Sequence, residues 1–320
     1  MNAPFPFFGG KREVTDVVWS RLGKPRQYIE PFCGSCAILL SASAPASLEV
    51  VNDLNGFIAN FWRAVKHQPG AVAAEADFPV SHIDLGARHV WLMQQRDRLG
   101  AELQDPHWPG DPQVAGWWLW GQCSWIGSGW CEWDRQIPHV SDAGMGVQAL
   151  GQIPHVSDAG MGVQALGQIP HMSNAGRGLL TSAGRVAWEW LHKLADRLER
   201  VRIVHGEWSR CLNHHYGDTD TAVFLDPPYR SYGAPYGAAA VADDVAAWAR
   251  ENSELRVCLC GHIGDYEMGD GWQIVQWTRP RLTYSGSNTT DKEALYFSPA
   301  CLVPKETGQE VFNFSEAAHG

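Results

Sequence analysis

No apolar run in this chain of 320 residues approaches the length of about 20 residues that a membrane-spanning helix needs. The amino terminus, Met1 to Pro6, has neither the basic start nor the apolar stretch of a secretion signal. Hydrophobic residues make up 45% of the chain and charged residues 19%, which is typical of a folded globular protein. We therefore expect a soluble, cytoplasmic protein that binds no membrane.

Positive charge is also scarce. Lys and Arg number 25 against 35 Asp and Glu, which gives a formal net charge of −10. Non-specific binding to nucleic acid is dominated by the neutralisation of phosphates, so it needs a basic surface. The composition argues against a tight, non-specific grip on nucleic acid, although the sum over the chain can conceal a basic face.

Cysteine is too sparse for a disulfide scaffold, because eight cysteines are spread over a long chain and cytoplasmic thiols stay reduced. Cys33 and Cys36 have the spacing of a redox or metal pair, but no second pair of matching spacing lies near them. We expect no bound metal. Cys258 and Cys260 alternate within an apolar run, where thiols behave as small buried hydrophobes.

Two strand–turn–helix units open the chain. The strand candidates at 27–30 and 48–51 are each followed by a turn of polar or small residues and then by an apolar pattern of helical period. Two such units in series predict a parallel α/β sheet. A helical pattern continues over 71–98, and periodicity is lost over 99–116, where several prolines occur.

The α/β pattern resumes in the second half of the chain with a helical pattern at 186–198. Further strand candidates lie at 201–204, 222–225, 255–260, 273–277 and 294–297, with a helix candidate at 241–249. We expect a Rossmann-like sheet built from residues 1–100 and 186–302, an inserted region at 101–185 and a loosely held tail at 303–320.

The inserted region carries tryptophans and an internal repeat. Tryptophans cluster over 117–133, where core packing is the plainer interpretation and a base-stacking surface the alternative. A sixteen-residue repeat begins at Gln136, at Gln152 and, degraded, at Gln168. It predicts either a small repeated β-type substructure or a duplicated surface loop. Metal binding by its histidines is a weaker alternative, because no second ligand accompanies them.

The most specific stretch runs from Val223 to Tyr229 and reads Val-Phe-Leu-Asp-Pro-Pro-Tyr. An apolar strand candidate stops at Asp226, because Pro227 and Pro228 have a fixed φ and no backbone N–H. The stiff loop holds a carboxylate, an outward carbonyl and the flat ring of Tyr229 in one arrangement. These three features suit a planar ring that bears an amino group.

Several separated motifs carry a resemblance to a known family. Upstream of the Asp226 loop lie Phe8-Gly9-Gly10-Lys11, Glu30-Pro31-Phe32-Cys33-Gly34-Ser35 and Asn52-Asp53-Leu54-Asn55. In this order the motifs resemble those of the Dam-like, D12-class adenine-specific DNA methyltransferases, particularly the shorter phage-type members. The resemblance covers most of residues 5–301. It departs from the family at Cys36, where relatives usually have a second glycine.

The resemblance implies S-adenosylmethionine as the cofactor. In such a fold Asp53 binds the ribose hydroxyls, Glu30 receives the ammonium group, and Lys11 braces the loop or a nearby carboxylate. The residues that the resemblance assigns to the cofactor are Phe8, Gly9, Gly10, Lys11, Glu30, Phe32, Gly34, Asp53 and Asp226. No metal is needed.

The resemblance further implies transfer of the methyl group to the N6 amine of a flipped-out adenine in double-stranded DNA. Asp226 and Pro227 accept hydrogen bonds from the amine, Pro228 stiffens the loop, and Tyr229 stacks on the extruded base. The inserted region becomes the candidate for target recognition. The protein is expected as a monomer or weak dimer. Two alternatives remain: methylation of cytosine or RNA bases, and a catalytically inactive DNA-binding relative.

Overall fold

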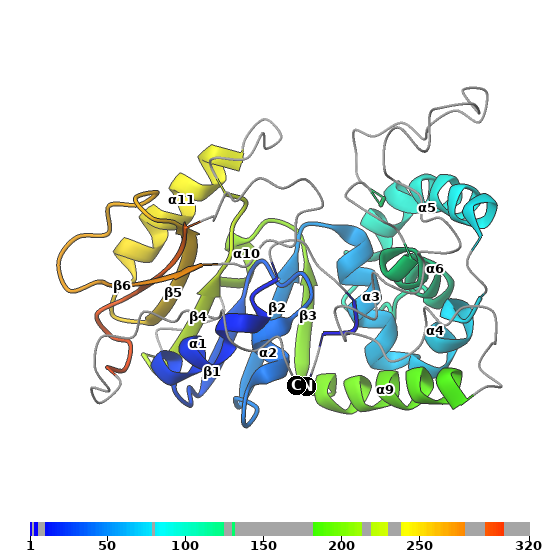
Figure 1. The fold of residues 1–320 in the computed structure, drawn as a ribbon, viewed down its shortest axis with the longest axis horizontal. Helices are drawn as coiled ribbons and strands as arrows, with labels where there is room; N and C mark the ends of the chain where they lie inside the picture. The colour runs from blue at the N-terminus through cyan, green and yellow to red at the C-terminus, as the bar shows by residue number, and fades with distance from the viewer. Residues whose placement is uncertain are drawn as a thin grey trace. The chain divides into compact units, whose positions relative to one another are not determined.

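The structure, a computed structural model, describes Met1 and residues 3–5, 10–78, 81–124, 130–131, 182–212, 219–229, 238–278 and 292–303. Its strands are β1 (Gln27–Glu30), β2 (Leu48–Asp53), β3 (Val201–His205), β4 (Thr221–Leu225), β5 (Arg256–His262), β6 (Gln273–Thr278) and β7 (Lys292–Phe297). Its helices (Figure 1) are η1 (Arg12–Val14), α1 (Thr15–Leu22), α2 (Ala37–Ser41), α3 (Gly56–His67), α4 (Pro69–Ala76), α5 (His82–Glu102), α6 (Pro112–Ser124), α9 (Ser182–Leu198), α10 (Ser209–Leu212) and α11 (Ala238–Glu251).

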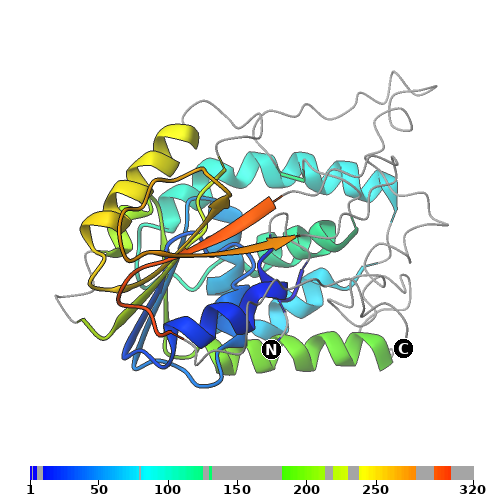
Figure 2. The same cartoon turned by 60° about the vertical axis from the view of Figure 1, so that its left-hand side comes forward.

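The strands form a seven-stranded sheet in the order β3-β2-β1-β4-β5-β7-β6. Strand β1 pairs in parallel with β2 and β4, and β4 pairs in parallel with β5. Strand β7 runs antiparallel to both β5 and β6, which lie beside it in Figure 2. The Rossmann-like α/β expectation is confirmed. Its parallel character ends at β7, and antiparallel strands at the edge of such a sheet are common.

The central strands are buried along their whole length. Every residue of β1 and β4 is buried, and five consecutive residues of β5 are buried. Strands covered on both faces read as continuous apolar runs, which is why these segments were recognisable in the sequence. Helices α1 and α11 both pack against β5 and flank these strands (Figures 1 and 2).

The order of strands reverses between β1 and β4. From β1 the chain continues to β2 on one side, whereas β4 pairs with the other edge of β1. Ile29 lies opposite Val223 in this pair, so the carboxyl ends of the two strands are neighbours. In open α/β sheets ligands bind beyond the carboxyl ends of the strands at such a reversal. The Asp226 loop follows β4 at this place.

The chain divides into two compact units. The first comprises the described residues within Met1–Gly10, Gly34–Leu40 and Asn52–Glu207, and the second those within Lys11–Cys33, Ser41–Val51 and Trp208–Gly320. The Gly34 turn and Asp53 therefore belong to the first unit. Lys11 and the Asp226 loop belong to the second.

The described tryptophans of the 117–133 cluster mainly serve the core of the first unit, as the plainer interpretation predicted. Trp118 and Trp120 are buried, and the ring of Phe5 meets the Trp118 ring edge to face at 4.9 Å between centroids. Trp130 packs so closely on α6 that a Cβ at Gly121 would collide with its indole ring. Two members of the cluster lie outside the described residues: Trp125 and Trp133.

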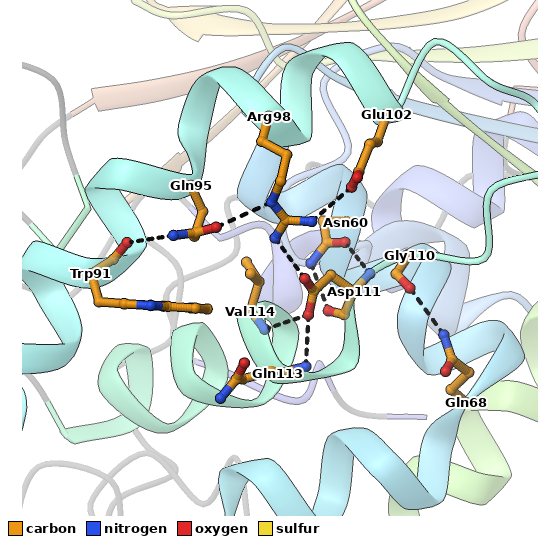
Figure 3. Close-up of polar contacts among 10 residues, drawn as sticks. All are labelled: Asn60, Gln68, Trp91, Gln95, Arg98, Glu102, Gly110, Asp111, Gln113 and Val114. Carbon is orange, nitrogen blue, oxygen red and sulfur yellow. Dashed lines mark hydrogen bonds and ion pairs between the residues drawn. The ribbon is translucent and has the colours of Figure 1, made fainter.

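The expected loss of helical structure over 99–116 is wrong in part. Helix α5 continues to Glu102, and α6 already begins at Pro112. Proline is tolerated at the first position of a helix, where its missing N–H has no partner to lose. The Asp111 carboxylate caps α6 by accepting the N–H groups of Gln113 and Val114 (Figure 3).

The helical pattern at 71–98 is two helices and not one. Helix α4 ends at Ala76, and α5 begins after Ser81, whose hydroxyl accepts the N–H of Asp84 at 3.1 Å. A serine at this position satisfies one of the open donors of the first turn. Helices α4, α5 and α6 lie together in the first unit (Figure 1).

Several predictions fall on parts of the chain that lie outside the described residues. These parts include the repeats between 136 and 181, the stretch 279–291 and the tail from residue 304. The proposed boundaries near residues 100, 185 and 303 also stay predictions. No helix within the described ranges is both long and apolar enough to cross a membrane.

Candidate active site

Lys11 and Asp226 form an ion pair at the carboxyl end of β4. The Lys11 side chain is only 3% exposed, and its Nζ atom donates to Oδ2 of Asp226 at 2.9 Å. Lys11 was expected to brace the loop or a nearby carboxylate, and the carboxylate that it contacts is that of Asp226. Within the described part of the chain Oδ1 of Asp226 accepts no hydrogen bond. One oxygen of a half-buried carboxylate is thus held by an ammonium and the other remains available as an acceptor.

Glu293 belongs to the same cluster, although it was not among the residues predicted from the sequence. It is the second residue of β7, is 5% exposed, and places Oε2 at 3.8 Å from Lys11 Nζ. The same oxygen accepts the hydroxyl hydrogen of Tyr229 at 3.2 Å. The sequence contained a signal for this residue, because Glu293 directly precedes the apolar strand candidate from Ala294 to Phe297. A buried carboxylate at such a place calls for a partner.

The ring of Tyr229 is held on several sides. Its hydroxyl donates to Glu293, and Lys11 Nζ lies 5.2 Å from the ring centroid. The imidazole of His262, which ends β5, lies at 4.8 Å with the two planes at 74°. His262 was not among the residues predicted for the site, because the segment that it ends favoured a structural role. The two prolines fix the backbone before the ring and these contacts fix the side chain, so the ring has a defined orientation.

Charges in the cluster set the protonation states of Lys11 and Tyr229. Burial lowers the pKa of the Lys11 ammonium, but the neighbouring Asp226 and Glu293 carboxylates raise it more, so its pKa lies above the usual value. Burial, together with the same carboxylates, raises the pKa of the Tyr229 phenol. Lys11 therefore stays charged at neutral pH and Tyr229 stays a hydrogen-bond donor.

A second group of predicted residues meets in the first unit. Asp53, the last residue of β2, accepts the N–H of Gly34 at 2.9 Å through Oδ2 and the N–H of Asn55 at 2.8 Å through Oδ1. Asn55 in turn caps α3 by accepting the N–H of Phe57. The indole of Trp62 donates to the carbonyl of Gly34 at 2.9 Å. The turn after β1 is therefore tied to the end of β2.

The Asp53 carboxylate has an unusual proton affinity. Burial raises its pKa to about 6, although the N–H groups of Asn55 and Gly34 favour the charged form and lower it. Within the described residues each of its oxygens accepts one hydrogen bond, from Gly34 or from Asn55. A carboxylate oxygen has two lone pairs, so both oxygens can accept a further hydrogen bond.

Cys36 takes a backbone conformation that usually belongs to glycine. Its φ is +52° and its side chain is fully buried, and Gly34, two residues earlier, has a φ of +44°. A residue with a Cβ loses about 1 kcal/mol or more in this left-handed region. The departure from the resembled family is thus accommodated by strain, and the turn keeps a glycine-like shape. The carbonyl of Cys36 accepts the N–H of Leu40 in α2.

The remaining predicted residues are distributed as follows. Glu30 is 2% exposed and accepts the hydroxyl of Tyr28 at 2.9 Å. Phe32 is half-buried and stacks on Trp208 with centroids 6.2 Å apart and planes at 23°. Trp208, an aromatic residue just after β3, was not singled out in the sequence. Gly10 and Pro227 are at least half-buried and Pro228 is exposed, whereas Phe8 and Gly9 lie outside the described residues.

All eight cysteines, Cys33 and Cys36 included, are buried and reduced. Within the described ranges no group of three or more His, Cys, Asp and Glu side chains is placed to hold a metal ion.

Comparison with known proteins matches the first part of the chain to a family. Residues 7–79 match the family of D12 class N6 adenine-specific DNA methyltransferases. The matched segment contains Lys11, Glu30, Gly34 and Asp53, and it ends upstream of the Asp226 loop. None of the curated proteins matches the chain. The family acts on DNA and requires a methyl donor. Residues 7–79 are thus similar to this family, and the match supports an adenine-specific DNA methyltransferase.

Proposed function

We propose that the protein takes its methyl group from S-adenosylmethionine and transfers it to an adenine that has been extruded from double-stranded DNA. The observation that carries this proposal is the Lys11–Asp226 ion pair, which lies at the carboxyl end of β4 beside the reversal in strand order. Ligands bind at this place in open α/β sheets. The pair leaves one Asp226 oxygen available for the substrate.

Asp226 and the carbonyl of Pro227 act on the target amine. The nitrogen lone pair of the adenine amine is delocalised into the ring, so the amine is a poor nucleophile. Hydrogen bonds from its two hydrogens to Oδ1 of Asp226 and to the Pro227 carbonyl favour a pyramidal nitrogen with an exposed lone pair. Lys11 orients the carboxylate by holding Oδ2. Holding both reactants in line contributes up to about 7–11 kcal/mol to lowering the barrier.

Tyr229 receives the extruded base. The amine of a paired adenine is locked in the duplex, so the base must leave the stack before it reacts. An aromatic ring at the end of a stiff loop replaces part of the lost stacking, and such stacking is worth about 1–3 kcal/mol per base.

The Gly34–Asp53 group fits the ribose of the cofactor. Each Asp53 oxygen retains capacity for one hydroxyl group, and the missing side chain of Gly34 lets the backbone approach a ligand. When bound, S-adenosylmethionine supplies an electrophilic methyl group on a sulfonium. We assign the ammonium group to the Glu30 carboxylate and an apolar face to Phe32. From their motifs alone, Phe8, Gly9, Gly10 and Lys11 are assigned to the cofactor as well, whereas Asp226 acts on the amine.

Target recognition belongs to the inserted region at 101–185 in this proposal. The repeated histidines His139, His155 and His171, with neighbouring serine hydroxyls and glycine amides, supply candidate phosphate contacts. We propose that the protein acts as a monomer or weak dimer.

Replacement of Asp226 tests the mechanism. Asp226→Ala should abolish methyl transfer and leave the affinity for S-adenosylmethionine nearly unchanged, because Asp226 faces the amine and not the ribose. The measurement is transfer of a labelled methyl group to DNA that lacks adenine methylation, with nucleoside analysis of the product and calorimetry for the cofactor. Asp16→Ala, an exposed aspartate on α1, is the matched control and should behave like the wild type.

Wild-type turnover in Asp226→Ala would contradict the proposed role of the loop. A label recovered in methylcytosine instead of N6-methyladenine would contradict the assignment of the substrate amine.

A further inference from the structure

We propose that Glu293 is a positioning residue for methyl transfer, which holds the ring of Tyr229 in its working orientation through the tyrosine hydroxyl. The inference rests on the proposed function of the Asp226 loop. Glu293 lies in none of the motifs that carry the resemblance to the family. It belongs to β7, near the carboxyl end of the chain.

Sheet pairing brings Glu293 to the loop. Strand β7 runs antiparallel to β5, and Glu293 lies opposite His262 in their register. On the other side Glu293 lies opposite Trp277 of β6. The residue is separated from Tyr229 by 64 positions along the chain, yet their side-chain oxygens are 3.2 Å apart. The position of the carboxylate is therefore defined by three strands and not by a loop.

Burial of the Glu293 carboxylate is unfavourable for the free energy of folding. Glu293 is 5% exposed in a strand whose next residues, Ala294 to Phe297, are all buried and mostly apolar. A buried ion pair replaced by apolar side chains of similar size is often as stable or more stable. Stability alone therefore does not account for a glutamate here, whereas a hydrogen-bonding task at Tyr229 does.

The task is to fix the distal end of the tyrosine. Pro227 and Pro228 restrict the backbone before Tyr229, but its side chain still turns about its own two torsions. The hydroxyl bond to Glu293 anchors the ring at the end opposite its Cβ, and His262 and Lys11 contact the ring itself. A base that stacks on this ring lies parallel to it. The hydrogen bond to Glu293 therefore determines the direction in which the adenine amine points toward Asp226.

Lys11 connects the same anchor to the Asp226 carboxylate. Its ammonium lies 2.9 Å from Asp226 Oδ2 and 3.8 Å from Glu293 Oε2. An ammonium has three donors, so one group can bond to Asp226 and still attract Glu293. Tyr229 and Asp226 are thus held by a single connected cluster, which keeps the ring and the carboxylate in a constant relation.

A double-mutant cycle tests the proposal. Glu293→Leu removes the acceptor and Tyr229→Phe removes the hydroxyl, and each should slow single-turnover methylation of DNA by about 10- to 100-fold. The combined variant should be no slower than the slower single variant, because both changes break one hydrogen bond. The affinity for S-adenosylmethionine should stay within about twofold of the wild type.

Glu293→Gln provides the rescue arm of the experiment. Its amide oxygen still accepts the tyrosine hydroxyl, so its rate should stay within about threefold of the wild type. Glu49→Gln is the matched control, since Glu49 is also a buried glutamate on a strand of the same unit. Thermal unfolding of every variant separates loss of folding from loss of positioning, and Tyr229→Phe and Glu293→Gln carry the test if Glu293→Leu does not fold.

Three results would overturn the inference: additive losses in the combined variant, a Glu293→Leu rate equal to the wild type, or a Glu293→Gln rate as low as that of Glu293→Leu. Failure of the proposed function has a different signature. An active Asp226→Ala enzyme removes the loop mechanism itself, whereas an inactive Asp226→Ala with fully active Glu293 variants removes only the role of Glu293.

Discussion

Lys11, Asp226 and Glu293 show how single residues with ionisable side chains are tolerated inside this protein. Two of them, Lys11 and Glu293, are almost fully buried, and an unpaired buried charge is strongly unfavourable. Each has an oppositely charged partner, and the Tyr229 hydroxyl supplies a further hydrogen bond. Removal of one member of a buried ion pair typically costs about 3–5 kcal/mol, so this cluster ties function and folding together.

Asp53 predicts a pH dependence of cofactor binding. Its pKa is raised to about 6, so the carboxylate takes up a proton as the pH falls through that value. A charged acceptor binds hydroxyl donors more strongly than a neutral one. The affinity for S-adenosylmethionine should therefore fall by up to about tenfold per pH unit below pH 6 and be nearly constant above about pH 7. Calorimetry over this range measures it.

The raised pKa of Asp53 also makes the stability of the fold depend on pH. Because the fold raises the pKa above its unfolded value, the contribution of Asp53 to stability is present at low pH and is lost as the pH rises through about 6. Asp53→Asn removes the titration and is the control, with a weaker and pH-independent affinity expected. An affinity equal to the wild type in Asp53→Ala would exclude Asp53 from the cofactor site.

At the scale of elements, helix and strand ends determine where the functional groups lie. Strand β4 stops at two prolines, α3 starts at the Asn55 cap, and the α6 cap at Asp111 also links neighbouring helices. Figure 3 shows Asp111 between α6, Arg98 of α5 and Asn60 of α3, with which its backbone exchanges two hydrogen bonds. One residue thus joins three helices of the first unit.

Asp111→Ala should lower the free energy of unfolding by about 1–2 kcal/mol. The variant loses the cap of α6 and one partner of Arg98, whose guanidinium donates to Oδ2 of Asp111 at 2.6 Å. Urea unfolding monitored by circular dichroism measures the change.

Glu102→Ala is the matched control for this prediction. It removes the other carboxylate that pairs with Arg98, but the pair is exposed and such pairs contribute about 0.5 kcal/mol or less. Equal destabilisation by the two variants would show that the ion pairs matter and that the cap does not.

At the scale of the whole molecule, the net negative charge weakens general attraction to DNA, and the inserted region is the proposed place of recognition. With a net charge of −10 the chain has little general attraction for DNA, so affinity must depend on a local surface. The Trp118 and Trp120 side chains belong to a core and are not available for base stacking. The repeats remain the part of the proposed recognition region that has no other assigned role.

Deletion of one repeat, residues 152–167, should weaken binding to DNA and alter the set of methylated sequences. The thermal unfolding midpoint should change little, because two further copies of the segment stay in the chain. Sequencing with modified-base detection after expression in a host without adenine methylation reads the preference, and a gel-shift titration reads the affinity. An unchanged affinity and preference would identify the repeats as a duplicated loop without a role in recognition.

Local rules were enough to predict the class of fold and much of the candidate site. Apolar runs marked the strands, Pro227 and Pro228 marked the end of β4, and Gly34 and Asp53 marked the turns, because backbone restrictions act within a few residues. The same local logic failed at α6. The prolines predict the end of helical structure, whereas Pro112 begins a helix that Asp111 caps.

By itself, then, the sequence determined which segments are strands, where they end, and that a carboxylate, a carbonyl and an aromatic ring follow β4. Only the tertiary structure decided that Lys11 pairs with Asp226 across 215 positions, that β7 runs antiparallel to β5, and that Glu293 reaches Tyr229. The physical reason is the range of the forces. Torsional preferences and caps are encoded within one or two turns of chain, whereas strand pairing brings together distant segments whose order no local pattern specifies.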